Sequence, residues 1–174
     1  MNATFKIRDS QAGDIEALDR LYPDAFPEED LVPLVHALLA GDQPVLSLVA
    51  TSGGEVVGHV VFTRCAVPEC GGRAALLGPL AVAPARQKAG IGSALIRAGH
   101  EKLAAEDVTQ VLVLGDPAYY SRHGFAPERA VAPPYPLPDE WDGAWQSLAL
   151  GGGPALEGTL DVPASWRHPE YWGA

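Results

Sequence analysis

A strand that runs through a glycine-containing turn into a helix is the feature that most constrains this chain. Residues 76–82 read Leu-Leu-Gly-Pro-Leu-Ala-Val, and the turn that follows carries Gly90 and Gly92. Over 91–106 the apolar residues recur at helical spacing, which predicts an amphipathic helix with its apolar stripe on a sheet. The chain is therefore expected to fold as an α/β domain in which this turn joins a strand to a helix.

The turn has the composition of an anion site. A helix that begins directly after a turn presents unpaired backbone N–H groups and the positive end of its dipole at one point, where phosphates bind. Gly90 and Gly92 remove side chains where a ligand must come close to the backbone, and Arg86 and Lys88 add positive charge. A Gly-x-Gly pair alone is a weak signal, because ordinary turns also contain it. Neither common glycine-loop nucleotide motif is complete here, so ATP binding is a remote alternative.

The residues around the turn carry a more specific pattern. Gln87-x-x-Gly90-x-Gly92 follows an apolar strand, and a helix, the apolar strand 111–114 and Tyr120-x-x-x-Gly124-Phe125 come after it. This order resembles the acetyl-coenzyme-A-binding core of the GNAT N-acetyltransferase superfamily. The resemblance implies a mixed, mostly antiparallel central sheet, splayed at the acetyl-coenzyme-A site and flanked by helices. It also implies acetyl-coenzyme A as co-substrate, without a metal.

The resemblance assigns cofactor binding to the end of the strand, the turn and the start of the helix. In GNAT proteins the strand corresponding to 76–82 parts from the one corresponding to 110–115, and the pantetheine arm lies in the gap. Pro79 marks such a bulge or strand edge because proline cannot donate to a ladder. The residues assigned to the cofactor are Leu80, Ala81, Val82, Gln87, Lys88, Ala89, Gly90, Ile91, Gly92, Ser93 and Tyr120.

Two side chains are candidates for catalysis. Tyr120 occupies the position at which many GNAT enzymes carry a tyrosine that protonates the coenzyme A thiolate, although aromatic packing is the alternative. The backbone N–H of Leu80, or of a neighbour, is the expected donor to the oxyanion. His59 is the only titratable side chain inside its strand and is a candidate base through water, against the alternative of a hydrogen-bonded core residue. Asp116-Pro117 stands where the family often has Asn, which puts the orientation of Tyr120 in question.

Length and charge limit the remaining possibilities. The chain has 174 residues, of which 47% are hydrophobic, so one GNAT domain over 1–174 is expected. A net charge of −10 argues against a nucleic-acid surface and is compatible with cationic substrates. The sequence contains no apolar run of membrane-spanning length and no apolar signal core at its start, so we expect a cytoplasmic protein without membrane contact. Cys65 and Cys70 are expected to be free thiols.

Local patterns predict the other elements. Strands are expected over 4–8, 45–51 and 55–64, the last two as a hairpin through Ser52-Gly53-Gly54. Helices are expected over 14–22, stopped by Pro23, and over 28–39. A loop is expected over 65–73, and a strand buried on both faces over 111–114.

The chain after residue 130 is the least regular part. The expected domain core covers 4–130, and 131–174 forms an extension rich in proline, glycine and tryptophan, with one strand candidate at 145–150. We expect the extension either to wrap the sheet and shape the acceptor site or to mediate a homodimer. Its aromatic residues are too apolar to be merely solvated.

The leading functional hypothesis is an N-acetyltransferase. It would transfer the acetyl group of acetyl-coenzyme A to a primary amine of a small molecule or protein, by direct attack in a ternary complex. The alternative is a GNAT-fold protein that binds an acyl-coenzyme A without turnover and acts as a sensor or scaffold. The identity of the acceptor stays open, because surface charge does not choose between polyamines, aminoglycosides, amino acids and protein N-termini.

Overall fold

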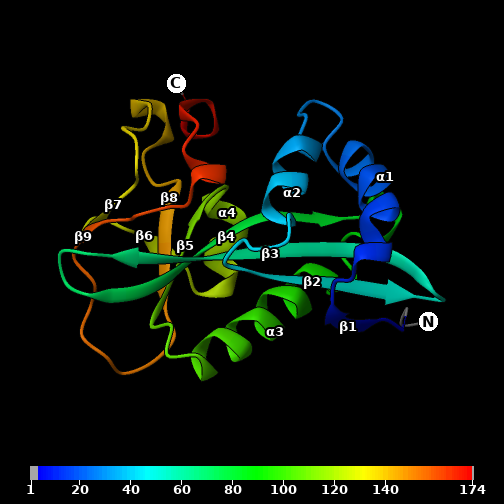
Figure 1. Ribbon diagram of the computed structural model, residues 1–174, viewed down its shortest axis with the longest axis horizontal. Coiled ribbons are helices and arrows are strands. Elements are labelled where there is room, and N and C mark those ends of the chain that lie inside the picture. The colour runs from blue at the N-terminus through cyan, green and yellow to red at the C-terminus, as the bar shows by residue number, and fades with distance from the viewer. Residues whose placement is uncertain (1–3, 174) are drawn as a thin grey trace. The chain divides into compact units, whose positions relative to one another are not determined.

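The computed structural model of the protein describes residues 4–173 and contains one seven-stranded sheet (Figure 1). The strands are hydrogen-bonded in the order β1-β2-β3-β4-β5-β8-β6, and β7 and β9 form a separate parallel pair. β4 and β5 run parallel, whereas the pairs β1–β2, β5–β8 and β6–β8 are antiparallel. The expected mixed, mostly antiparallel sheet is confirmed.

The chain divides into two compact units, Met1–Phe62 with Gly78–Glu101 and Thr63–Leu77 with Lys102–Ala174. The first unit comprises β1 (Lys6–Asp9), η1 (Ala12–Asp14), α1 (Ile15–Ala25), α2 (Val32–Leu38), β2 (Val45–Ser52), the first part of β3 (Glu55–Val67), the last part of β4 (Gly72–Val82), η2 (Pro84–Arg86) and most of α3 (Ile91–Ala105). The expectation of a single domain with a core over 4–130 stays a prediction.

In the first unit, helices pack on both faces of β3 (Figure 1). On one face the ring of Tyr22 from α1 meets the ring of His59 edge-on, with centroids 5.6 Å apart. On the other face the ring of Phe62 contacts the ring of His100 in α3, with centroids 5.8 Å apart. His59 and Phe62 are three positions apart, so alternation along the strand directs them to opposite faces.

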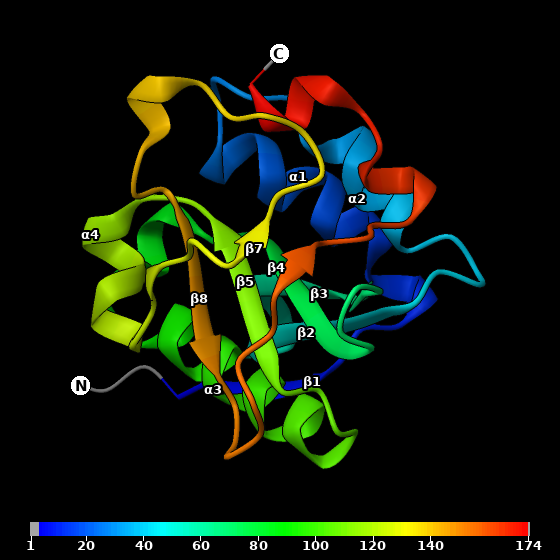
Figure 2. The same cartoon turned by 90° about the vertical axis from the view of Figure 1, so that its left-hand side faces the viewer.

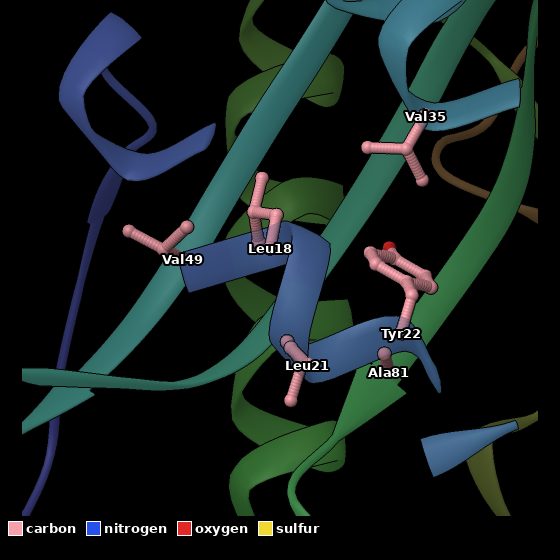
Figure 3. Close-up of a cluster of buried hydrophobic side chains, with 6 residues drawn as sticks. All are labelled: Leu18, Leu21, Tyr22, Val35, Val49 and Ala81. Carbon is pink, nitrogen blue, oxygen red and sulfur yellow. The ribbon is translucent and has the colours of Figure 1, made fainter. Parts of the chain in front are cut away.

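The core beneath α1 and α2 joins both helices to the sheet. Its buried side chains come from α1, α2, β2 and the end of β4 (Figure 3), and they are Leu18, Leu21, Tyr22, Val35, Val49 and Ala81. Because Ala81 belongs to this cluster, the packing of α1 and α2 helps to hold the end of β4 in place. Burial of a large apolar side chain contributes about 2 kcal/mol, so this cluster is a major source of stability in the unit.

The second unit holds the remaining elements. They are β5 (Gln110–Leu114), α4 (Pro117–Tyr120), η3 (Ser121–His123), β6 (Ala126–Pro127), β7 (Val131–Ala132), η4 (Asp139–Trp141), β8 (Trp145–Ala149), β9 (Gly158–Thr159), η5 (Ala164–Trp166) and η6 (Pro169–Trp172). β8 pairs with β5 along its whole length, from Gln110 opposite Ala149 to Leu114 opposite Trp145 (Figure 2). The strand expected at 145–150 therefore belongs to the central sheet.

Three local expectations need correction. Pro23 does not stop the first helix, because it lies in the last turn of α1, where the chain continues to Ala25 and Phe26 N–H still donates to the Tyr22 carbonyl at 2.8 Å. The second helix begins at Val32, not within the acidic run 28–30. The loop expected over 65–73 is shorter, since β3 continues to Val67 and β4 begins at Gly72. At these ends of β3 and β4, pairing between the strands overrides weak local loop signals.

Candidate active site

The turn between β4 and α3 is built from short local hydrogen bonds. After β4 ends at Val82, Ala83 N–H donates to the Val57 carbonyl of β3 at 2.9 Å. The side-chain amide of Gln87 donates back to the Val82 carbonyl at 3.2 Å, which closes the turn upon itself. Arg86 donates from Nη1 to the Ser52 hydroxyl at 3.1 Å, so the last residue of β2 holds this cation in place. These contacts fix the entry of the chain into α3.

Backbone conformation then exposes the start of α3. Lys88 and Gly90 both lie in the left-handed region, with φ of 63° and 87°. The helical ladder begins with Ala94 N–H donating to the Gly90 carbonyl at 3.0 Å, so the N–H groups of Ile91, Gly92 and Ser93 precede it. Residues 87–90 are exposed. Free N–H groups, a fifteen-residue helix and adjacent positive charge fit a diphosphate group.

The end of β4 changes its pairing where the sequence predicts it. β4 pairs with β5 from Ala74 opposite Gln110 to Leu77 opposite Val113, and the register ends there, directly before Gly78-Pro79. Beyond that point burial alternates, with Ala81 buried and Leu80 and Val82 half-buried. This pattern agrees with the strand edge expected at Pro79, and it leaves the assignment of Leu80, Ala81 and Val82 to the cofactor as a prediction.

His59 is the centre of a buried chain of hydrogen bonds in the first unit. Its side chain is 0% exposed, with Nδ1 2.6 Å from the Tyr22 hydroxyl and Nε2 2.8 Å from the Ser47 hydroxyl. Ser10 donates from its hydroxyl to Ser47 at 2.7 Å and extends the chain. A neutral imidazole offers one donor and one acceptor, so both ring nitrogens are satisfied.

Burial determines the charge of His59. Removal from water disfavours the imidazolium and lowers the pKa of His59 from 6.5 to about 3, even though the Asp14 carboxylate acts in the opposite direction. The ring is therefore neutral at physiological pH. Its weak basicity and its two occupied nitrogens do not favour the base role predicted from the sequence, which stays a prediction.

Tyr120 lies at the end of α4 in the second unit. Its ring packs against Gly115, where an added Cβ would lie 2.5 Å from the ring, and it meets the rings of Tyr119 and Phe125 at centroid distances of 4.9 and 5.6 Å. Asp116 caps the helix by accepting from Ala118 N–H at 2.9 Å. Burial, with a smaller effect of Tyr119, raises the pKa of Tyr120, so the phenol keeps its proton at neutral pH.

Sequence reasoning missed the partners of His59. Tyr22 was expected only as a residue of the helix over 14–22, and Ser47 and Ser10 were not expected at the site. Tyr22 is 37 positions from His59 along the chain, so no local sequence pattern indicates the contact between them. The only available signal was that a polar residue inside an apolar strand requires hydrogen-bond partners.

The fold is that of an α/β protein, and the turn before α3 has the backbone geometry that suits a bound anion. The sequence profile described as "Acetyltransferase (GNAT) family" matches residues 15–125, so the chain belongs to this family. The chain is also 38% identical, over 98% of its length and 96% of the relative's, to the protein named uncharacterized N-acetyltransferase YjhQ of Escherichia coli K12. It is accordingly an acyltransferase with acetyl-coenzyme A as co-substrate.

Solved structures show the same fold. A GNAT family acetyltransferase from Brucella melitensis, in complex with acetyl-coenzyme A, superimposes with a TM-score of 0.75 at 29% identity and covers 94% of this chain and 99% of its own. The Escherichia coli GNAT family N-acetyltransferase YhbS, in complex with coenzyme A, gives a TM-score of 0.81 at 27% identity, with 94% and 92% covered. Both agree with the cofactor expected from the sequence.

Proposed function

We propose that the protein transfers the acetyl group of acetyl-coenzyme A to a primary amine of a small molecule or protein, by direct attack in a ternary complex. The observation that carries the proposal is the turn at 87–93, in which two left-handed residues precede the first N–H groups of α3. This arrangement suits a bound anion after the end of β4. Relatives with N-acetyltransferase names, and structural neighbours that contain acetyl-coenzyme A or coenzyme A, support the same reaction.

Each part of the reaction has a candidate residue in this chain. Acetyl-coenzyme A supplies an activated acetyl thioester. We expect the N–H groups at the start of α3 to hold the diphosphate and the backbone N–H of Leu80 to donate to the carbonyl oxygen as negative charge develops there. As the new C–N bond forms and the C–S bond breaks, Tyr120, kept protonated by burial, would give its proton to the departing thiolate, and the proton that the amine nitrogen loses would restore the phenol. The protein must also receive the amine in its neutral form.

The contacts of His59 support a structural role in preference to proton abstraction. A base must reach the amine directly or through one water, and both His59 nitrogens already contact Tyr22 and Ser47. We therefore propose that His59 holds Tyr22 in the cluster that includes Ala81 and so helps to position the end of β4.

Replacement of Tyr120 tests the proposal. In an assay of coenzyme A release with a panel of amines, we expect Tyr120→Phe to lower kcat by a factor of about 100, because the variant keeps the ring and loses the proton. The dissociation constant for acetyl-coenzyme A should change by less than about threefold, which is under 1 kcal/mol.

Tyr119→Phe is the matched control, because it removes a neighbouring hydroxyl from the same short helix. We expect it to retain near-normal kcat. Equal activity of the two variants would contradict the role of Tyr120 as the proton donor to the thiolate. Binding of acetyl-coenzyme A by the unaltered protein without release for any amine would contradict the proposed function and favour the sensor.

A further inference from the structure

A cavity of about 430 Å³ lies at the carboxyl end of β5 in the second unit. Leu114, Gly115, Asp116 and Pro117 form one wall, and Glu140, Trp141, Asp142, Ala144 and Tyr171 complete the lining. A volume of this size is typical of small-molecule sites. Gly115 connects the cavity to the proposed acid, because the Tyr120 ring packs directly on that glycine.

The lining of this cavity combines three carboxylates with two aromatic rings and contains no Lys, Arg or His. Carboxylates attract cations by charge, and the face of an aromatic ring attracts them through its quadrupole. An anionic ligand would meet repulsion from every charged lining residue. The side chains that line the cavity therefore favour a positively charged ligand.

The three carboxylates differ in whether they already accept a hydrogen bond or form an ion pair. Asp116 accepts from Ala118 N–H at 2.9 Å, and Asp142 accepts from Arg129 Nη1 at 2.9 Å in an exposed pair. Glu140 is exposed, and within residues 4–173 its carboxylate has no hydrogen bond or ion pair. Glu140 is thus the carboxylate with its full charge available to a ligand.

A second cavity adjoins the first. It has a volume of about 740 Å³, shares Trp141 and Asp142 with the smaller one, and is also lined by Tyr135, Trp145 and Asp139. The shared residues make the two hollows neighbours around η4, so a ligand longer than the first cavity has room to extend along further aromatic and acidic side chains. The one cation in the larger lining is Arg129, and its Nη1 is paired with Asp142 at 2.9 Å. A compound with two separated charges suits such a surface better than one with a single charge.

We propose that the cavity at the end of β5 binds an acceptor amine that carries a second positive charge, such as an aliphatic diamine or a longer polyamine. The inference rests on the proposed acetyltransferase function and names the substrate class for it. Glu140 and Asp142 would bind the distal ammonium group, and Trp141 and Tyr171 would pack against the carbon chain and the cation.

Three amines with the same five-carbon chain between the amino group and the opposite end group test the charge preference. Cadaverine carries a second ammonium group, pentylamine carries none, and ε-aminocaproate carries a carboxylate in its place. Binding is measured by calorimetry with saturating coenzyme A, which lacks the acetyl group and so prevents turnover. We expect cadaverine to bind at least about tenfold more tightly than pentylamine, and ε-aminocaproate most weakly.

The double variant Glu140→Gln/Asp142→Asn should bring the cadaverine-to-pentylamine ratio close to one. Glu157→Gln is the matched control, since Glu157 is exposed in the same unit and lines neither cavity. Equal binding of the three probes, absence of binding, or a preference for cadaverine that survives in the double variant would overturn the inference.

Coenzyme A release from acetyl-coenzyme A, measured with the same probes, reports separately on the proposed function. One possible result is that cadaverine binds preferentially, that the double variant loses this preference, and that no amine causes release. This result would support the cavity assignment and contradict the acetyltransferase function. Release with an amine panel but without a preference for dications would support the acetyltransferase function and contradict the cavity assignment.

Discussion

His59 shows how one buried residue can couple the stability of this protein to pH. Its ring is enclosed between Tyr22 and Ser47 with its pKa lowered to about 3, whereas in the unfolded chain it titrates near 6.5. Between these two values the unfolded protein binds a proton that the folded protein does not. Stability is therefore complete above about pH 6.5 and is lost as the pH falls toward about 3.

We expect the free energy of unfolding to fall by about 2 kcal/mol between pH 7 and pH 5 through His59 alone, since each pH unit in this window contributes about 1.4 kcal/mol. Urea unfolding of the protein and of His59→Gln at both pH values measures this, because all other titrating groups are common to the two proteins. An equal loss in both would show that His59 is charged in the folded state.

At the scale of the element, the turn between β4 and α3 depends on a left-handed backbone. Gly90 has φ of 87° and no heavy atom within 4 Å of an added Cβ, so alanine there introduces backbone strain without a clash. Strain of this kind costs about 1–2 kcal/mol, and relaxing it would rotate the peptide groups that enter α3.

We expect Gly90→Ala to lose about 1 kcal/mol of stability and at least about tenfold in affinity for coenzyme A, because the bound diphosphate requires the native direction of the N–H groups. Gly53→Ala is the control, with φ of 58° and equally open surroundings in the β2–β3 turn. It should lose similar stability and keep its affinity. Calorimetric titration with coenzyme A and urea unfolding give both quantities, and parallel affinity losses would contradict the assignment.

The local elements were largely predictable, because their signals lie within a few residues. The glycine turn and the hairpin at 53–54 are present as expected, and the helix expected over 91–106 is α3, Ile91–Ala105. Pro23 was misread as a stop because the rule for proline assumes that a missing N–H ends the ladder, whereas packing of Leu21 and Tyr22 carries α1 to Ala25.

At the scale of the whole molecule, the segment after residue 130 is part of the folded core of the second unit. β8 occupies the sheet beside β5, and Trp166 donates from its indole N–H to the Thr63 hydroxyl at 3.0 Å, a contact across 103 positions. Trp172 is 1% exposed and donates to the Trp166 carbonyl at 3.0 Å. The segment thus completes the core, and the expected homodimer and cytoplasmic location stay predictions. No helix among residues 4–173 has the length and apolar character that a membrane crossing requires.

We expect Trp172→Ala to lower the free energy of unfolding by about 3–5 kcal/mol, through lost burial, a cavity and a lost hydrogen bond. Trp141→Ala is the control, since Trp141 is 36% exposed and should cost less than about 1 kcal/mol. Urea unfolding compares the two. Similar losses would mean that Trp172 is not a core residue.

The sequence by itself determined the family, the glycine-containing turn before α3 and the position of Tyr120 after β5, because each of these depends on short spacings between glycines, apolar residues and one aromatic. Only the tertiary structure decided that His59 is enclosed by Tyr22 and Ser47 and that Glu140, Trp141 and Tyr171 share a cavity with the end of β5. Those contacts join segments far apart along the chain. They arise from packing of the core, to which no local pattern in the sequence corresponds.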